Sequence, residues 1–540
     1  MNAPTKRHWL IALCLSCACS SADAQTAPVD AGGAASRQFV VRSVRIDGNS
    51  LLPESELAER VVSLVGSERT AADLRQAAAA VQDAYRQAGY AGVVAYIPEQ
   101  PLASGEIVIR VVEGRLAQVK ISGNQRYDEA NIRQSLPNLR EGETPRVRAI
   151  DRDIQLANEN PVKELRVVLT AGARPGDVDA SIEVAEESPQ RVLIGFDNTG
   201  DPSTGDYRLS IGFQHANLWN LDHIGTFQYQ TSPTDANLVQ IYSLGYRLPL
   251  YGHAASIDAF VAYSSVDNGT TTTVAGPLQF TGKGKIAGLR ANRYLERIGE
   301  YDHRLTLGLD WRDLQNDCRL GAFGAAGCGT AGVSVVVLPL SLTYTGQVQT
   351  PESAWGFAGW LAQNAGGSSD EDFKAARPRA DKYYSIARLS GFAGFAPPTG
   401  FGLQGRLSAQ SSPDALVPVE QFGLGGASSV RGYREREVAG DSGLYVNLEG
   451  LAPDLRQIIG FENASLRPLA FFDWGQVTNR YRWPCAGTDT RCSLSSVGVG
   501  VRFAVGRYFS GRLDVAHTLE DGPQTPAGKN RGSVALNFVF

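Results

Sequence analysis

The stretch RLSIGFQ, Arg208–Gln214, decides the fold of the larger part of this chain. Successive side chains of a β-strand point to opposite faces of the sheet. Leu209, Ile211 and Phe213 therefore share one face, while the other carries only arginine, serine, glycine and glutamine. A face this polar does not suit the core of a β-sandwich. It suits a water-filled lumen, and the apolar face would then meet lipid.

The same alternation continues from about residue 191 to the end of the chain. Segments of about ten residues alternate apolar and polar positions between clusters of Gly, Asp, Asn and Pro, as membrane strands and their connections do. At roughly 20 to 22 residues for a strand with its connection, residues 189–540 hold about sixteen strands, an even number that suits a closed antiparallel transmembrane β-barrel. The final stretch, SVALNFVF, Ser533–Phe540, predicts the closing strand, since every second side chain is apolar.

An internal repeat organises the N-terminal part. The motif VRIDGN, Val44–Asn49, is echoed 75 residues later by VKISGN, Val119–Asn124. A period of this length is too long for a solenoid and fits two tandem small domains, 39–114 and 115–188. Each copy reads as a strand, a Gly-Asn turn, two helices and two strands, an α+β domain. The expected helices and later strands are 54–65, 71–87, 92–97 and 106–112 in the first copy, and 128–135, 147–158, 164–170 and 177–183 in the second.

The first residues predict export. Two basic residues precede the apolar run Trp9–Cys19, and Ala22-Asp23-Ala24 forms a small-x-small cleavage site, so residues 1–24 read as a secretory signal peptide. Cysteines within this segment leave a lipoprotein signal as the alternative, although none follows the usual leucine and small residues. A short segment, 25–38, then precedes the first repeat. No later stretch of about 18 apolar residues could form a transmembrane helix.

Four cysteines follow the signal as two close pairs, Cys318 with Cys328 and Cys485 with Cys492. In an oxidising compartment these pairs predict two short disulfides in long loops, with free thiols as the alternative. A formal net charge of -5 excludes a strongly basic nucleic-acid binder. The sequence contains no P-loop, GxSxG, HExxH or CxxC motif, and its histidines lack metal-ligand spacing. We therefore expect no cofactor, no metal site and no enzyme activity.

Two motifs stand out in the barrel-like region. Val430, Arg431, Gly432 and Tyr433 form VRGY within a Gly/Ser-rich stretch, and some forty residues later Phe471, Asp473 and Gly475 form the pattern FxDxG. An arginine and an aspartate among glycines and aromatics are tolerated only if they are exposed or paired. Taken alone, the VRGY motif fits a solvated loop arginine as well as a functional one. The FxDxG motif likewise fits an ordinary strand-end aspartate as well as a functional one.

Together with the signal peptide, the two Gly-Asn repeats and the barrel-like region, these motifs resemble the TpsB outer-membrane transporters of two-partner secretion. This is the family that exports haemolysins and filamentous haemagglutinin-like adhesins, and the similarity covers residues 39–540. The resemblance implies that 39–114 and 115–188 are POTRA domains in the periplasm and that 189–540 is a sixteen-stranded barrel in the bacterial outer membrane. It also implies that the loop carrying VRGY, the sixth extracellular loop, folds back into the lumen.

The resemblance implies roles for single residues as well. Arg431 would lie in the lumen and pair with Asp473 on the wall, with Phe471 and Gly475 framing the contact. Gly432 would let the loop approach the wall, Tyr433 would offer a stacking face, and the flanking charges at 434–437 would be solvated. Many family members carry an N-terminal plug helix, but the segment 25–38 is too short to supply one, so the folded loop is expected to be the main occluder.

The expected function is an outer-membrane pore that recognises an unfolded exoprotein through its POTRA domains and translocates it to the cell surface without nucleotide hydrolysis. A free sheet edge could pair with such a peptide, although an edge that binds nothing fits the residues as well. The expected partners are a large secreted haemolysin or adhesin and outer-membrane lipid, with no nucleic acid. The alternatives are an outer-membrane protein insertase of the POTRA-barrel superfamily and a barrel enzyme such as a lipase, for which no Ser/His/acid signature is present.

Overall fold

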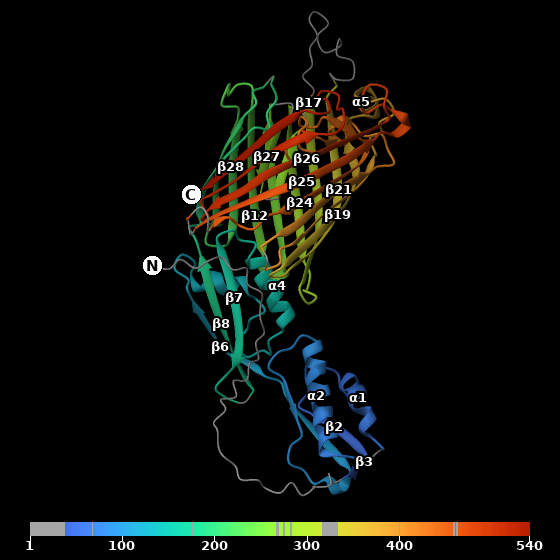
Figure 1. The fold of residues 1–540 in the computed structure, drawn as a ribbon. Helices are drawn as coiled ribbons and strands as arrows, with labels where there is room; N and C mark the ends of the chain where they lie inside the picture. The colour runs from blue at the N-terminus through green and yellow to red at the C-terminus, as the bar shows by residue number, and fades with distance from the viewer. Residues whose placement is uncertain are drawn as a thin grey trace, which may run out of the picture. The chain divides into compact units, whose positions relative to one another are not determined.

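A computed structural model of the chain describes residues 38–540, except 67, 175, 203, 266–268, 274–275, 281–282, 316–332, 399, 457–459 and 461–462. The chain forms two compact units, Met1–Glu187 and Ser188–Phe540 (Figure 1). The predicted signal peptide, residues 25–37 of the short segment, and the pair Cys318 and Cys328 lie outside the described residues.

The first unit contains two α/β modules built on one plan, with helices and strands where the sequence predicts them. The first has β1 Phe39–Val40, β2 Ser43–Asp47, α1 Glu54–Val61, η1 Val62–Leu64, β3 Glu68–Arg69, α2 Ala71–Gln87, β4 Val94–Tyr96, η2 Leu102–Ser104 and β5 Glu106–Val112. The second has β6 Arg115–Ser122, α3 Glu129–Ser135, α4 Val147–Ala157, β7 Lys163–Ala171 and β8 Asp177–Glu186. Their three-stranded sheets have the orders β2-β5-β4 and β6-β8-β7, and in each the first strand is parallel to the last.

The Gly-Asn repeat has a steric cause in both modules. Gly48 adopts a φ of +93°, and a Cβ atom there would lie 2.3 Å from the carbonyl oxygen of Val111 on β5. Gly123 has a φ of +87° and stands in the same relation to Val184 on β8, again at 2.3 Å. Only glycine combines this backbone conformation with so close an approach. The repeat therefore marks the turn that seats each first strand against the last strand of its own sheet.

The first module has its own hydrophobic core. Leu57 of α1, Leu74 and Val81 of α2, and Ile107 and Ile109 of β5 are buried together between the helices and the sheet. Helix α2 begins at a capping box, in which the side chains of its first turn satisfy the orphan backbone donors. This cluster draws only on residues of the first module, so the module has a core of its own.

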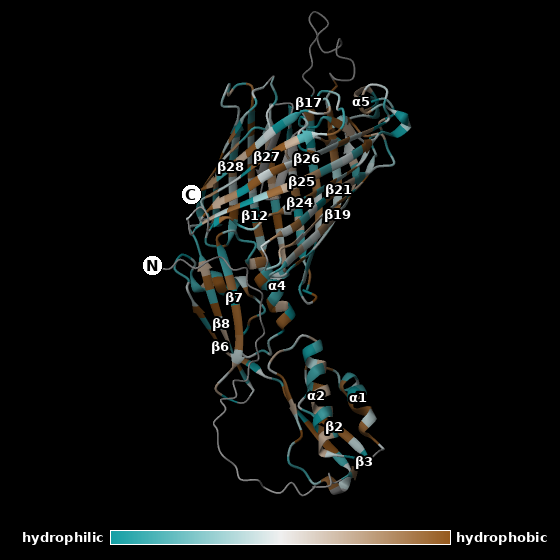
Figure 2. Ribbon diagram, in the orientation of Figure 1, coloured by the Kyte–Doolittle hydropathy of each residue, from teal (hydrophilic) through white to brown (hydrophobic). Residues whose placement is uncertain are grey.

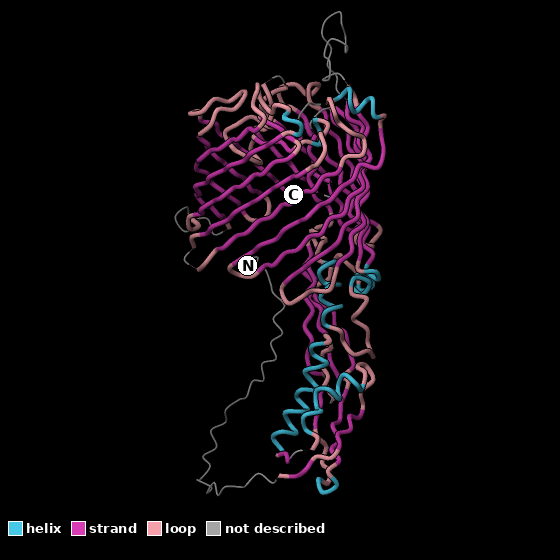
Figure 3. The backbone as a smooth tube through the Cα atoms, turned by 90° about the vertical axis from the view of Figure 1, so that its right-hand side faces the viewer, coloured by secondary structure: helices cyan, strands magenta, loops and turns pink. Residues whose placement is uncertain are grey.

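The second unit is a closed barrel of sixteen antiparallel strands, which confirms the predicted fold and strand number. Each strand pairs with the next along the chain, and β28 closes the barrel on β9 (Figures 1 and 3). The strands are β9 Gln190–Asp197, β10 Arg208–Leu218, β11 His223–Thr231, β12 Gln240–Leu250, β13 Ala255–Ser264, β16 Lys283–Tyr294, β17 Tyr301–Gln315, β18 Val335–Gln349, β19 Ser353–Gly367, β20 Ser385–Phe395, β21 Gly402–Ser411, β24 Ser442–Leu451, β25 Ala464–Thr478, β26 Arg491–Val505, β27 Phe509–Thr518 and β28 Asn530–Val539.

The outer face of the barrel is apolar, as the alternation in β10 predicts. Ile211 and Phe213 are 48% and 46% exposed although both are large hydrophobic residues. Figure 2 shows hydrophobic residues along the strands of the wall. The predicted closing strand lies in place: Phe540 and Val192 exchange two backbone hydrogen bonds of 2.9 and 3.0 Å, and Phe538 stacks on Phe509. Among the described helices, none has the length and apolar character needed to cross a bilayer.

Alternate connections between barrel strands, beginning with the one from β9 to β10, belong to the same rim of the barrel and are here called loops 1 to 8 in chain order. Loop 5 is 368–384, loop 6 is 412–441, loop 7 is 479–490 and loop 8 is 519–529. The remaining elements of this unit are η3 Tyr251–His253, β14 Gly269–Thr273, β15 Gly276–Phe280, α5 Asp370–Ala376, η5 Pro418–Glu420, β22 Phe422–Leu424, β23 Val438–Gly440 and η6 Arg480–Arg482. Strands β22 and β23 pair only with each other, so loop 6 carries a hairpin that is not part of the barrel sheet.

Candidate functional site: loop 6 against the barrel wall

Three carboxylates face the barrel interior at one place on the wall. Glu449 lies on β24, Asp473 on β25 and Asp514 on β27, and all three are buried. Leu448 and Phe472, the chain neighbours of the first two, are exposed on the outer face, so strand alternation directs the carboxylates inward. Buried carboxylates in such proximity require cations or hydrogen-bond donors.

Arg431 of loop 6 supplies that cation. Its Nε and Nη2 atoms lie 2.7 and 2.9 Å from the two oxygens of Asp473, and its backbone N–H donates to the same carboxylate at 3.1 Å. Its Nη1 atom donates to Glu449 at 2.8 Å and lies 3.4 Å from Asp514. One bidentate guanidinium therefore ties loop 6 to three strands of the wall.

Phe471 provides the other face of this contact. The guanidinium carbon of Arg431 lies 3.3 Å from the centre of the Phe471 ring, so the cation stacks on the ring. The ring needs space on β26, where a Cβ atom at Gly498 would come within 2.3 Å of it. Phe471, Arg431 and Asp473 are thus brought together as one site.

The neighbours of Arg431 fix the loop by packing. Val430 and Tyr433 are buried in a hydrophobic cluster with Leu424 of β22 and residues of β24, β25 and β26. Gly475 leaves room for this cluster, since a Cβ atom there would lie 2.8 Å from Leu424. The Tyr433 hydroxyl lies 2.7 Å from the carbonyl oxygen of Glu520 in loop 8. Tyr433 is therefore enclosed between loop and wall.

Gly432 allows the close approach. It has a φ of +95°, and a Cβ atom there would lie 3.1 Å from Thr518 and 3.2 Å from Ala516 on β27. Gly432→Ala should weaken the binding of loop 6 to the barrel wall by about 1–2 kcal/mol. Alanine disfavours a positive φ, and Thr518 and Ala516 must also move to accept its Cβ atom.

We expect single-channel recordings of Gly432→Ala in planar bilayers to show openings roughly 5 to 30 times more frequent than in the wild type. Gly450→Ala is the matched control, because nothing lies within 4 Å of the Cβ position at Gly450. Equal opening frequencies in the two variants would show that Gly432 does not limit the loop.

Comparisons with known proteins place the chain in a family. The family described as haemolysin secretion/activation protein ShlB/FhaC/HecB matches residues 176–503, more than half of the chain. The chain belongs to this family. A ShlB-type POTRA domain matches residues 39–114. Outer membrane transporter CdiB of Dickeya dadantii is 25% identical over 75% of this chain and 71% of its own length, and CdiB of Escherichia coli is 25% identical over 78% and 70%.

The solved structure of CdiB from Escherichia coli has the same fold, with a TM-score of 0.77, 22% identity and coverage of 95% of this chain and 93% of that one. The protein is thus an outer-membrane transporter of the two-partner secretion type, with its POTRA region in the periplasm, and the family match decides against the insertase alternative. The ShlB/FhaC/HecB family is a transporter family, not an enzyme class. Its members act with a secreted exoprotein.

In this family member, the expectation that all charges flanking VRGY are solvated is wrong for Glu437. Its side chain is buried, and Oε1 accepts hydrogen bonds from the backbone N–H groups of Gln524 and Thr525 at 2.6 and 2.7 Å. Thr525 also donates its hydroxyl to Oε2 at 2.9 Å. Loop 8 folds over loop 6 and provides these donors, which lie 87 and 88 residues away in the sequence. Spacing along the chain could not reveal them.

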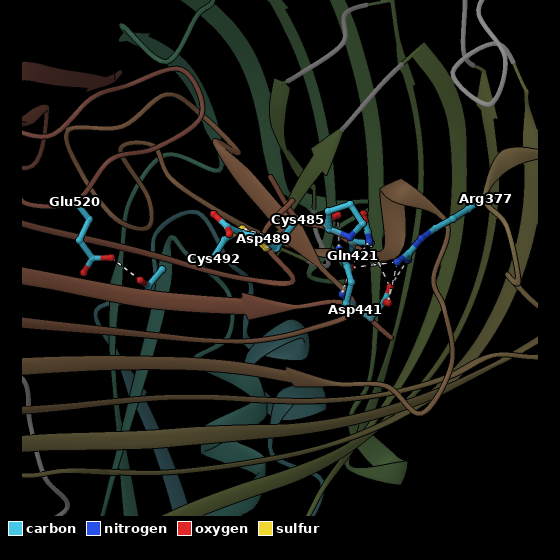
Figure 4. The surroundings of a disulfide bond; sticks show 10 residues. Arg377, Gln421, Asp441, Cys485, Asp489, Cys492 and Glu520 are labelled. Carbon is cyan, nitrogen blue, oxygen red and sulfur yellow. Dashed lines mark hydrogen bonds and ion pairs between the residues drawn. A yellow bond between two sulfur atoms is a disulfide. The ribbon is translucent and has the colours of Figure 1, made fainter. Parts of the chain in front are cut away.

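The disulfide between Cys485 and Cys492 is present, with a sulfur to sulfur distance of 2.02 Å (Figure 4). The prediction that both cysteines lie in a loop is wrong for Cys492, which is the second residue of β26. This strand begins early because residues 491 and 492 already pair with Thr478 and Val477 of β25. Both cysteines pack on the cluster that holds Val430. The disulfide therefore braces loop 7 directly over loop 6.

Sequence reasoning missed three of the five charged residues of the site, Glu449, Asp514 and Arg502. Arg502 of β26 donates to Glu449 at 3.2 Å and to Asp514 at 2.7 Å, and Asn447 donates to Asp473 at 2.6 Å. The signal available was a charged or amide side chain at the inward position of an alternating strand. That signal is shared by many lumen residues. It therefore could not single out the residues that meet Arg431.

Proposed function

We propose that this protein captures its unfolded partner exoprotein in the periplasm through both α/β modules and passes it through the barrel, and that loop 6 leaves the lumen wall to open the path. Binding in the periplasm and folding outside would drive the transport, without nucleotide hydrolysis. The second module, 115–188, would act as a second POTRA domain, as its βααββ order and its sheet order β6-β8-β7 suggest.

One observation carries this proposal: the hairpin of loop 6 is attached to the wall by side chains and is not paired into the barrel sheet. A paired strand could leave only by breaking a ladder of backbone hydrogen bonds. Loop 6 is held by side-chain contacts, such as those of Arg431 and the cluster around Val430, and these can break while the sixteen strands stay closed. The burial of Val430, Arg431 and Tyr433 supports loop 6 as the occluding element.

The chemistry of the modules indicates only the class of the cargo. Recognition at the sheet edge of a module uses mainly backbone hydrogen bonds, which suits an extended polypeptide of the haemolysin or adhesin kind. The test is co-expression with a large secreted protein encoded beside this gene, followed by measurement of that protein in the medium. We expect it to reach the medium only when the transporter is present. Equal secretion without the transporter would contradict the proposal.

A further inference from the structure

A second charged contact holds loop 6 at its outer root, away from Arg431. Asp441, the last residue of the loop, is 0% exposed. Its carboxylate accepts hydrogen bonds from the backbone N–H groups of Leu416 at 2.9 Å and Arg480 at 2.8 Å. The guanidinium of Arg377 forms a two-point ion pair with it, in which Nη2 lies 2.9 Å from Oδ2 (Figure 4). Asp441 thus joins loops 5, 6 and 7.

Loop 5 has its own structure that places Arg377. Helix α5 is preceded by Ser369, whose side chain caps the first turn in a capping box with Asp372. Phe373 of this helix is buried against Leu416 at the start of loop 6. Arg377 follows the helix directly, is 5% exposed, and also donates to the carbonyl oxygen of Leu416. It therefore contacts both roots of loop 6.

Loop 7 completes the contact. The side-chain oxygen of Asn479 accepts from the Asp441 backbone N–H at 3.1 Å and from Gln421 at 2.9 Å. Arg480 donates through Nε to the carbonyl oxygen of Ser412 at 2.6 Å. The disulfide from Cys485 of this loop to Cys492 of β26 packs on the cluster of loop 6, so loop 7 contacts both the root and the body of the hairpin.

We propose, resting on the function proposed above, that Arg377 and Asp441 form a second latch, which must open before loop 6 can leave the lumen. Arg377 is a positioning residue: it acts on loop 6 and not on the cargo. The two latches share no residue, since Arg431 binds wall strands whereas Asp441 binds loops 5 and 7. Releasing Arg431 alone leaves the outer root fixed. Exit of loop 6 therefore requires loops 5 and 7 to move as well.

The test is channel opening by the full-length protein in planar bilayers. Arg377→Ala leaves the buried carboxylate of Asp441 without its cation, so we expect the open fraction to rise about tenfold, with a smaller rise for Arg377→Lys, which keeps the charge. Lys374→Ala is the matched control, because Lys374 is an exposed cation of the same helix. The double variant with Arg431→Ala should open more than either single variant, as expected for independent latches.

Assembly is checked by heat-modifiable migration on gels. If Arg377→Ala does not assemble, Asp441→Asn replaces it, since the amide keeps an acceptor oxygen but loses the ion pair.

Reduction of the disulfide Cys485–Cys492 in a Cys318→Ser/Cys328→Ser background should also raise the frequency of channel opening, although it leaves Arg377 and Asp441 unchanged. Opening of Arg377→Ala and Asp441→Asn no greater than that of Lys374→Ala would overturn the latch. If these variants open more often while the wild type exports no exoprotein, the latch stands and the proposed function fails.

Discussion

Arg431→Ala is expected to reduce export of the partner exoprotein at least about tenfold, while the barrel still assembles. The substitution leaves Glu449, Asp473 and Asp514 buried with Arg502 as the one remaining cation among the contacts described above. Removing one member of a buried ion pair costs about 3–5 kcal/mol, because the other members keep their desolvation penalty. Loop 6 would then lose the contact that returns it to the wall, and the closed starting state of the export cycle would be depleted.

The measurements are the amount of exoprotein in the medium and the ion conductance of the purified protein. Arg434→Ala is the matched control from the same loop, since its ion pair with Asp201 is 3.6 Å long and both side chains are about 40% exposed. Exposed pairs of this kind contribute about 0–1 kcal/mol. Asp473→Ala should reproduce the effect of Arg431→Ala. Export at the wild-type level in both variants would show that the contact does not lock the loop.

Deletion of residues 40–114 is expected to abolish capture of the unfolded exoprotein, with a loss of affinity of at least about tenfold. The deletion removes the segment that matches the POTRA family, together with a core that is complete within it. Strand β4 is an edge of that sheet, and Val94 and Tyr96 on it are exposed. An edge of this kind can bind an extended peptide by adding it as a further strand.

Binding of chemically unfolded exoprotein to the purified transporter is the measurement, and heat-modifiable migration shows that the barrel remains folded. Point variants refine it: Val94→Ser with Tyr96→Ser should weaken binding, whereas Val62→Ser, at an exposed position on η1, should not. If protein lacking residues 40–114 binds the exoprotein as well as the intact chain does, capture by this module is wrong.

The fold was predictable because its signals are local. Alternation in Arg208–Gln214 and in Ser533–Phe540 shows which face of each strand meets lipid, and this property depends only on neighbouring residues. Gly48 and Gly123 mark the two modules in the sequence. Each has a positive φ and lies against a neighbouring strand, and this combination excludes every larger residue. The strand number followed from the length of the region and the regular spacing of strands.

The site was only partly predictable, because its residues are distant from one another in the chain. The sequence alone determined that Arg431 and Asp473 needed a counter-charge or solvent, because a lone charge among glycines and aromatics is costly to bury. Only the tertiary structure decided that Arg431 also meets Glu449 and Asp514, that Glu437 binds loop 8, and that Arg377 reaches Asp441, 64 residues away. Closure of the barrel and its strand register bring these residues together, and no local pattern encodes which inward side chain a returning loop will meet.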